Sequence, residues 1–188
     1  MTVAIIVVDA QNDFCEEGAL AVTGGLSTTE HIRTFLDLVV EEDPDDVVIV
    51  ATKDWHIDPE GHFAEEPDYV DTWPIHCVVD TDGADFAPAL RDFPFEKVFY
   101  KGKYTAAYSG FEGVTEEGVT LDAYLKIRGV HTVNIVGLAF DYCVAATARD
   151  AAQLGYTTFV LSGLTASVSP DNFISVAEAL TADDVAVL

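Results

Sequence analysis

The chain has 188 residues, 49% of them apolar, so it is long enough and apolar enough to fold around a core of its own. It carries 33 Asp and Glu against 9 Lys and Arg, a formal net charge of −24. Such a charge repels nucleic acid and anionic lipid. We therefore expect a single domain over residues 1–188 and partners that include neither nucleic acid nor a membrane.

The acidic residues are spread along the chain, as in the segments EEDPDD, AEEPD and TADDV, and do not form one tail. This spread is typical of a solvated surface. A surface so acidic and so poor in lysine resembles those of proteins from salt-accumulating halophiles. We expect a halophilic adaptation, with ordinary mesophilic acidity as the alternative.

Cellular location is indicated by three features. No apolar run approaches the roughly 20 residues that span a bilayer. The first segment, MTVAIIVVDAQ, lacks the basic start of a signal peptide and resembles a buried strand. Three cysteines, an odd number, do not form a disulfide framework, so a cytoplasmic, reducing location is expected.

Short β-branched runs predict six strands, at 3–8, 47–52, 97–100, 132–137, 157–162 and 184–188. Their continuous apolarity is typical of strands covered on both faces, as in a parallel sheet. Helical patterns lie between them at 31–42, 121–128, 142–154 and 171–180. Ser27 and Glu30 form a capping box for the first helix, Thr120 caps the second, and Pro170 opens the last.

Strands that alternate with helices predict an α/β domain. The expected architecture is a three-layer sandwich, with a six-stranded, mainly parallel sheet and helices on both faces. Residues 53–96 break this rhythm, since they hold both tryptophans and three of the five histidines but little periodicity. So long an irregular stretch usually has a task. It leaves the carboxyl end of the second strand, where open α/β sheets bind ligands.

The segment KDWHIDPEGH, residues 53–62, predicts a metal site. Asp54 and His56 are two positions apart, so they project to one side of an extended segment. With His76 they supply one carboxylate and two imidazoles, a set that suits Zn²⁺, Fe²⁺ or Mn²⁺. His62 could be a fourth ligand. The alternative is a polar loop with surface histidines.

Cys143 is the candidate nucleophile because it stands where a strand turns through GLAFDYC into a helix. The helix N-terminus favours a thiolate, and its N–H groups can form an oxyanion hole. Cys15 and Cys77 stand at no such turn and are interpreted as inert buried thiols. Asp9 and Lys101, at the ends of two strands, are the available base and electrostatic partner. Alternatively, Asp9 caps a turn and Lys101 is a surface charge.

Five motifs in order resemble the nicotinamidase/pyrazinamidase branch of the isochorismatase-like cysteine hydrolases. They are IIVVDAQNDFCEEGALAVTGG, ATKDWHIDPEGHF, TWPIHC, YKGKYTAAYSGFEG and VGLAFDYCVAATARDA. The likeness runs from the first strand to the final helix. It implies hydrolysis of the small molecule nicotinamide, and of pyrazinamide, to the acid and ammonia within NAD salvage.

The resemblance also implies roles for individual residues. The catalytic triad falls on Asp9, Lys101 and Cys143. The metal ligands fall on Asp54, His56 and His76, with His62 matching a ligand that only some members have; together they would hold one divalent transition metal per chain. The oxyanion hole falls on Ala139 and Cys143, after a cis peptide bond between Leu138 and Ala139. The aromatic residues that sandwich the ring fall on Phe14, Trp73 and Tyr108.

Tyr142 departs from the pattern, because it stands where several close relatives are expected to have histidine. This leaves the triad unchanged but alters the polarity of the pocket. Three alternatives stay open. Another amidase of this fold, of the N-carbamoyl amino-acid type, lacks the Asp-x-His…His loop. Isochorismate cleavage does not require the cysteine. A non-enzymatic metal-binding or redox-sensing protein would leave Asp9 and Lys101 without a task. The sequence does not decide between a monomer and a homo-oligomer.

Overall fold

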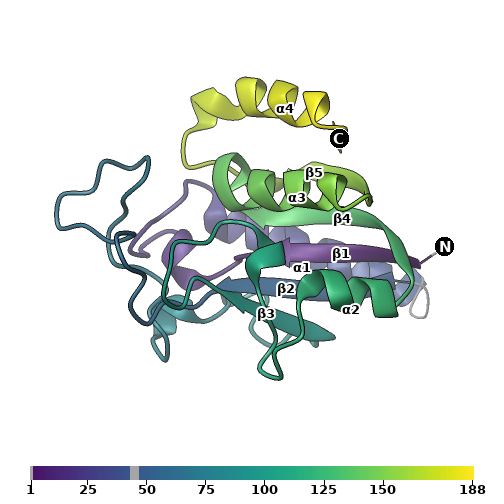
Figure 1. Cartoon of the computed structure of the whole chain (residues 1–188), viewed down its shortest axis with the longest axis horizontal. Helices are drawn as coiled ribbons and strands as arrows, with labels where there is room; N and C mark the ends of the chain where they lie inside the picture. Colours follow the sequence, from purple (N-terminus) through teal and green to yellow (C-terminus); the bar gives the residue numbers. More distant parts are fainter. Residues whose placement is uncertain (1, 43–46) are drawn as a thin grey trace.

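The computed structural model describes residues 2–42 and 47–188, which share one six-stranded sheet (Figure 1). The strands are β1 Thr2–Val8, β2 Val47–Asp54, β3 Lys97–Lys101, β4 Val130–Leu138, β5 Thr157–Ala166 and β6 Val185–Val187. Their order is β3-β2-β1-β4-β5-β6, and every neighbouring pair is parallel. The prediction of an α/β fold with a mainly parallel sheet is confirmed.

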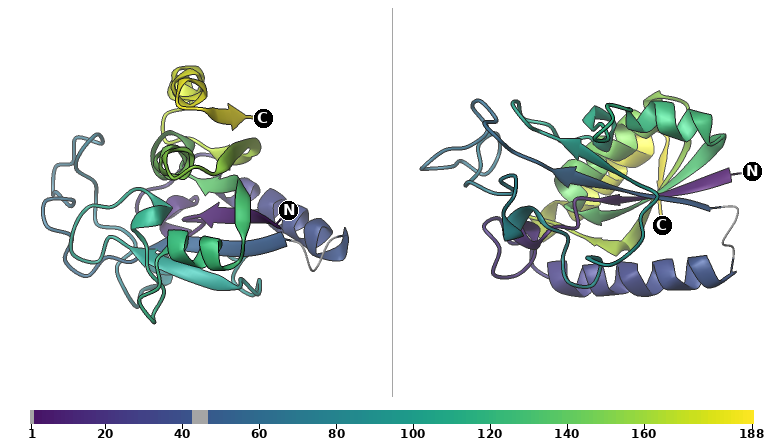
Figure 2. Two further views of the ribbon diagram at one scale, coloured as in Figure 1. Left: turned by 45° about the vertical axis from the view of Figure 1, so that its right-hand side comes forward. Right: turned by 90° about the horizontal axis from the view of Figure 1, so that it is seen from below.

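Four α-helices cover the two faces of the sheet: α1 Gly25–Glu42, α2 Leu121–Ile127, α3 Ala145–Gln153 and α4 Phe173–Ala182. Figure 2 shows α1 on one face and the other three helices on the opposite face. None of the helices within residues 2–42 and 47–188 combines the length and the apolar character needed to cross a bilayer.

Two core layers cover the two faces of the sheet, because alternate residues of each strand project to opposite faces. Ile6 of β1 packs in the layer that contains Leu125 of α2. Its neighbour Ile5 packs in the layer that contains Ile32 of α1 and Phe93 from the irregular stretch. The strands are therefore apolar on both sides, which explains their continuous apolar runs.

The predicted capping box of α1 is wrong. The helix begins at Gly25, so Ser27 lies within its first turn and not before it. The carboxylate of Glu16 accepts N–H bonds from the start of the helix instead, one of them from Leu26 at 2.8 Å. A side chain from a preceding loop thus takes the place of the local cap. The prediction missed it because Glu16 lies outside the sequence pattern of the helix.

The predicted helix starts at Thr120 and Pro170 agree with the structure, whereas α3 begins at Ala145, three residues after the predicted start at 142. Thr120 precedes α2 and its hydroxyl accepts an N–H bond from Ala123 at 3.3 Å. Pro170 opens a short 3₁₀ turn, Pro170–Asn172, that leads directly into α4.

The long segment between β2 and β3 is irregular, as predicted. Its longest helical piece is a 3₁₀ turn, Asp82–Ala84. In Figure 1 its blue and teal trace extends beyond the carboxyl ends of β1 and β2. The irregular segment is therefore placed to build a site at this edge of the sheet.

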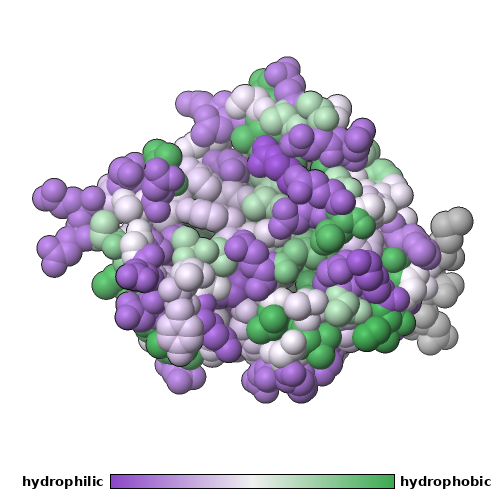
Figure 3. Space-filling model, viewed as in Figure 1, coloured by the Kyte–Doolittle hydropathy of each residue, from purple (hydrophilic) through white to green (hydrophobic). Residues whose placement is uncertain are grey.

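Figure 3 shows hydrophilic side chains over much of the visible face, with apolar residues in smaller groups between them.

Candidate active site

Four reactive side chains meet at the carboxyl edge of the sheet. Asp9 directly follows β1, Asp54 ends β2, Lys101 ends β3, and Cys143 lies in the turn after β4. All four are buried, and Asp9 has no exposed surface. Because the strands are parallel, their ends lie side by side, and residues more than 130 positions apart in the chain come together.

Lys101 is the centre of this group. Its ammonium Nζ lies 2.9 Å from Oδ2 of Asp9 and donates to Sγ of Cys143 at 3.6 Å. It also donates to the carbonyl of Ala107 at 3.1 Å. The expected convergence of Asp9, Lys101 and Cys143 is thus present in the geometry.

Thr52 orients Asp9, and the sequence reasoning did not single it out. Its hydroxyl donates to Oδ1 of Asp9 at 2.6 Å and accepts the N–H of Asp9 at 3.2 Å. Asp9 has a φ of 44°, in the left-handed region that aspartate tolerates better than most residues. The available signal was a threonine in an apolar strand, two positions before Asp54 and so on the same side of the strand.

The charges of the triad depend on one another. Burial raises the pKa of Asp9, and Lys101 offsets part of this rise. Burial alone would lower the pKa of Lys101, but Asp54 and Asp9 hold it well above its ordinary value, so the ammonium stays charged. Burial raises the pKa of Cys143 well above its ordinary value, and Lys101 offsets this only in part.

Burial next to two carboxylates favours the thiol form of Cys143, which runs against the expectation that the helix N-terminus favours a thiolate. The peptide bond between Leu138 and Ala139 is cis, as the resemblance implied. Cys143 follows in a π-helical turn, Phe140–Val144, that continues into α3.

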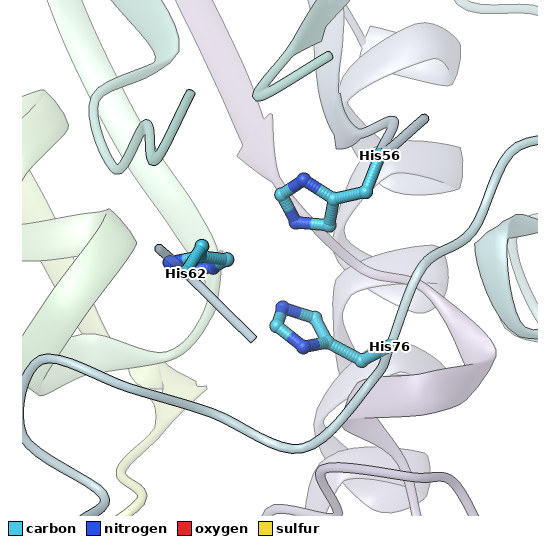
Figure 4. A group of neighbouring side chains, drawn as sticks. All are labelled: His56, His62 and His76. Atoms are coloured by element: carbon cyan, nitrogen blue, oxygen red, sulfur yellow. The ribbon is translucent and has the colours of Figure 1, made fainter. Parts of the chain in front are cut away.

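Three histidines from the irregular segment face one another (Figure 4). One ring nitrogen from each of His56, His62 and His76 lies within 4.8 Å of the other two, and all three residues are buried. Nδ1 of His56 lies 2.6 Å from the carbonyl of Gly102, and Nδ1 of His76 lies 2.7 Å from that of Pro74. A carbonyl only accepts, so each Nδ1 carries the hydrogen and each Nε2 offers a lone pair.

Asp54 lies between the histidines and the triad. Its Oδ2 is 3.7 Å from Nε2 of His56 and 3.9 Å from Nε2 of His76, while Oδ1 accepts from Lys101 at 2.5 Å. Burial alone would raise the pKa of Asp54, but Lys101 lowers it by more than burial raises it. The carboxylate is therefore ionised.

These donors fit a transition metal ion. Among the described residues, Nε2 of His56 and Nδ1 of His62 are buried without a hydrogen-bond partner. Burial and the neighbouring histidines lower the pKa of His62 to about 4, which keeps the imidazole neutral, as a ligand must be. Imidazole nitrogens with one carboxylate suit Zn²⁺, Fe²⁺ or Mn²⁺. A ring nitrogen of His62 lies within 4.8 Å of those of both His56 and His76, so His62 belongs to the same cluster.

A pocket opens over Cys143. Its lining includes all three predicted ring-binding aromatics, together with Ala139 of the predicted oxyanion hole. The lining residues are Phe14, Leu20, Asp54, His62, Trp73, His76, Ala107, Tyr108, Ala139, Tyr142, Cys143 and Val168. Leu20, Ala107 and Val168 were not predicted, because single apolar residues in loops carry no sequence signal.

Tyr142 joins the aromatic wall of the pocket. Its ring packs edge-on against Trp73, with centroids 4.8 Å apart, and stacks on Tyr108 at 6.2 Å. Its hydroxyl donates to the carbonyl of Tyr69 at 3.2 Å. Trp73 in turn donates from Nε1 to the hydroxyl of Tyr108 at 3.0 Å. Tyr142 therefore links the turn that contains Cys143 to the irregular segment, through its contacts with Tyr69 and Trp73.

Asp141 holds the loop that carries Val168, one of the residues that line the pocket. Its carboxylate accepts the N–H groups of Val168 and Ser169, each at 2.9 Å. Cys15 and Cys77 are buried free thiols that do not line the pocket. Burial raises the pKa of Cys15 to about 12, which agrees with an inert thiol.

Comparison with known proteins agrees with this geometry. The Isochorismatase domain family matches residues 3–181. The nicotinamidase/pyrazinamidase of Mycobacterium tuberculosis is 53% identical over 93% of this chain and 92% of its own length. A pyrazinamidase of Pyrococcus horikoshii, solved in complex with zinc, superposes with a TM-score of 0.82 at 33% identity, covering 100% of this chain and 99% of that one.

The yeast nicotinamidase bound to the inhibitor nicotinaldehyde superposes with a TM-score of 0.85 at 31% identity, again over 100% of this chain and 99% of that one. This chain shares the fold of these proteins, and it places a buried cysteine at the carboxyl edge of its own sheet. The chain belongs to the isochorismatase family, in its nicotinamidase/pyrazinamidase branch. The resemblance read from the five motifs is thereby confirmed.

Proposed function

We propose that the chain hydrolyses nicotinamide to nicotinate and ammonia, and pyrazinamide in the same way. The observation that carries this proposal is the joint position of two groups in one pocket. Cys143 lines this pocket and contacts Lys101, which in turn contacts Asp9, and His62 and His76 of the histidine cluster line the same pocket. The first group acts on a carboxamide, and the second recognises the ring that bears it.

The reaction begins with proton transfer. Asp9, held by Thr52, takes the proton of the Cys143 thiol, and Lys101 keeps the resulting negative charge in place. Sγ then forms a bond to the carboxamide carbon. The C–N bond breaks, and Asp9 gives its proton to the departing nitrogen, which leaves as ammonia. Water hydrolyses the thioester, which releases nicotinate and restores the thiol.

The raised pKa values of Asp9 and Cys143 support this order of events. A cysteine that rests as a thiol requires a base within reach, and a base whose pKa is raised holds the transferred proton well enough to deliver it later. The N–H groups of Ala139 and Cys143 are proposed to bind the oxyanion that forms during attack and thioester hydrolysis.

Substrate positioning is assigned to the walls. Phe14, Trp73 and Tyr108 are proposed to hold the ring between their faces. Asp54, His56, His62 and His76 would hold the divalent transition metal, one ion per chain. When bound, this ion supplies a Lewis-acidic contact for the pyridine nitrogen, directly or through water, and so fixes the ring's orientation. Zinc is one candidate, since the Pyrococcus horikoshii relative was solved with it.

The three free cysteines also support a reducing, cytoplasmic location.

The proposed activity is tested by ammonia release from nicotinamide, with an N-carbamoyl amino acid assayed separately as the alternative substrate. Release from nicotinamide that a chelator suppresses and added metal restores is expected. Release from the N-carbamoyl compound alone would assign the chain to the other amidase type, and release from neither would favour a binding or sensing protein.

A further inference from the structure

Gln11 is a buried polar residue that the mechanism does not use. It lies two positions after Asp9, has no exposed surface and does not line the pocket. Its carboxamide makes three hydrogen bonds to backbone groups. Nε2 donates to the carbonyls of Asp54 and Ala84, at 2.8 and 3.0 Å, and Oε1 accepts the N–H of Asp54 at 2.9 Å.

The position of Gln11 follows from the way β1 and β2 separate. Their register ends at the pair Val7 and Ala51, and the chain then turns away at Asp9. Asp54 is paired with Lys101 of β3 on one side only. On its other side the neighbouring strand is missing at a buried position. The side-chain amide of Gln11 supplies the donor and the acceptor that the strand no longer provides.

The use of a side-chain amide in place of a neighbouring strand has a physical reason. A buried backbone N–H or C=O without a partner costs free energy comparable to a lost hydrogen bond. Glutamine is the residue whose side chain ends in a primary amide long enough to bond both backbone groups of one residue. Asp54 lines the pocket, so the bonds that close this gap also fix the backbone beside the pocket.

Asp54 is the residue whose placement matters most here, because its two carboxylate oxygens face different groups. Oδ1 accepts from Lys101, and Oδ2 faces Nε2 of His56 and His76. A movement of its backbone by a fraction of an ångström displaces both oxygens at once. Ligands of metal sites are commonly held by such outer contacts.

We propose that Gln11 is a positioning residue that holds Asp54 in the geometry required to bind the metal ion. The inference rests on the proposed function only in that Asp54 is taken as a ligand. Gln11 is not one of the proposed ligands and does not line the pocket, so it acts through the backbone of Asp54.

Asn12 provides a matched control. Its side chain also reaches back to the irregular segment, where Nδ2 donates to the carbonyl of Asp82 at 2.6 Å. Asp82 and Ala84 belong to the same 3₁₀ turn. Asn12→Ala therefore removes a hydrogen bond to this turn and leaves intact both hydrogen bonds between Gln11 and the backbone of Asp54. Gln11→Met has similar length and removes all three bonds, and Gln11→Glu keeps an acceptor but loses both donors.

The experiment measures Zn²⁺ affinity of the purified full chain by competition with a chromophoric chelator, alongside the absorption spectrum of the Co²⁺-loaded protein. Gln11→Met is expected to bind Zn²⁺ about 10- to 100-fold more weakly than wild type and to change the Co²⁺ spectrum. Asn12→Ala should match wild type in both. Thermal melting of each metal-free variant verifies that it is folded.

Wild-type affinity and an unchanged Co²⁺ spectrum in folded Gln11→Met would overturn the inference. So would an equal loss in Asn12→Ala, because that result would indicate general loosening of the 3₁₀ turn. If Gln11→Met does not fold, Gln11→Glu carries the same test with the same two readouts. Failure of the wild-type chain to bind Zn²⁺ or Co²⁺ would instead count against the proposed metal role of Asp54, and is thereby distinguished.

Discussion

Lys101 and Asp54 are register partners at the ends of β3 and β2, and Nζ of Lys101 lies 2.5 Å from Oδ1 of Asp54. The same ammonium lies 2.9 Å from Asp9. Asp54 therefore belongs both to the charged group around Cys143 and to the histidine cluster. One buried cation between two carboxylates joins the part of the site that reacts to the part that binds.

Replacement of the nucleophile tests the proposed chemistry. Cys143→Ala removes the atom that bonds to the carboxamide carbon, and we expect less than about 1% of wild-type turnover. Nicotinamide binding, measured by calorimetry, should persist, since the aromatic walls and histidines remain. Cys15→Ala is the control, a buried thiol outside the pocket, and it should keep most of the activity. More than a few per cent of turnover in Cys143→Ala would reject the mechanism.

The metal content of histidine variants tests the ligand set. His56→Ala and His76→Ala each remove an imidazole whose Nε2 faces the cluster, so purified protein should lose the metal ion that wild type retains. Elemental analysis provides the measurement. His131→Ala alters an exposed histidine on β4 and should leave the content unchanged. Active, metal-free wild-type protein would remove the positioning role assigned to the ion.

Acid stability tests the environment of His62. Its pKa falls from an ordinary 6.5 to about 4 on folding, chiefly because it is buried. Between these two pH values the unfolded chain binds more protons than the folded one, so the free energy of unfolding decreases as the pH falls. In chelator, the melting temperature of wild type should drop more steeply from pH 6.5 to 4 than that of His62→Gln. Parallel curves for the two proteins would contradict this.

Substrate choice tests the role of the ring nitrogen. Benzamide has the amide and the ring shape of nicotinamide but lacks the nitrogen that the metal is proposed to contact. A site built around a polar contact discriminates strongly against an analogue without it, so benzamide should react at least about 100-fold more slowly. Pyrazinamide keeps a nitrogen at the equivalent position and should be hydrolysed. An ammonia assay on the three amides decides, and equal rates for benzamide and nicotinamide would refute the assignment.

Salt dependence tests the proposal of a halophilic adaptation. With a formal charge of −24, carboxylates repel one another across the surface. Molar KCl shortens the screening length to about 3 Å and should raise the melting temperature. Differential scanning calorimetry in low and molar KCl provides the comparison. Equal melting temperatures would argue against halophily without affecting the enzymatic assignment.

Hydrogen bonds between distant segments set the limit of what the sequence predicts. Gln11 bonds to Asp54, and Thr52 bonds to Asp9, in each case across 43 positions of the chain. Asp141 bonds to Val168 across 27 positions. Such pairs leave no local pattern, because the side chains that meet lie on different elements. The α1 cap failed for a similar reason: Glu16, outside the helical pattern, takes the place of Ser27.

The sequence by itself determined the alternation of strands and helices, the parallel sheet and the family. Apolar periodicity reflects which residues are buried, and burial follows from local pattern. It also indicated which residues stand at strand ends, among them Asp9, Lys101 and Cys143. Only the tertiary structure decided their charge states. Burial beside Asp9 and Asp54 keeps Cys143 a thiol despite its helix terminus, because the cost of placing a charge away from water depends on neighbours contributed by the whole fold.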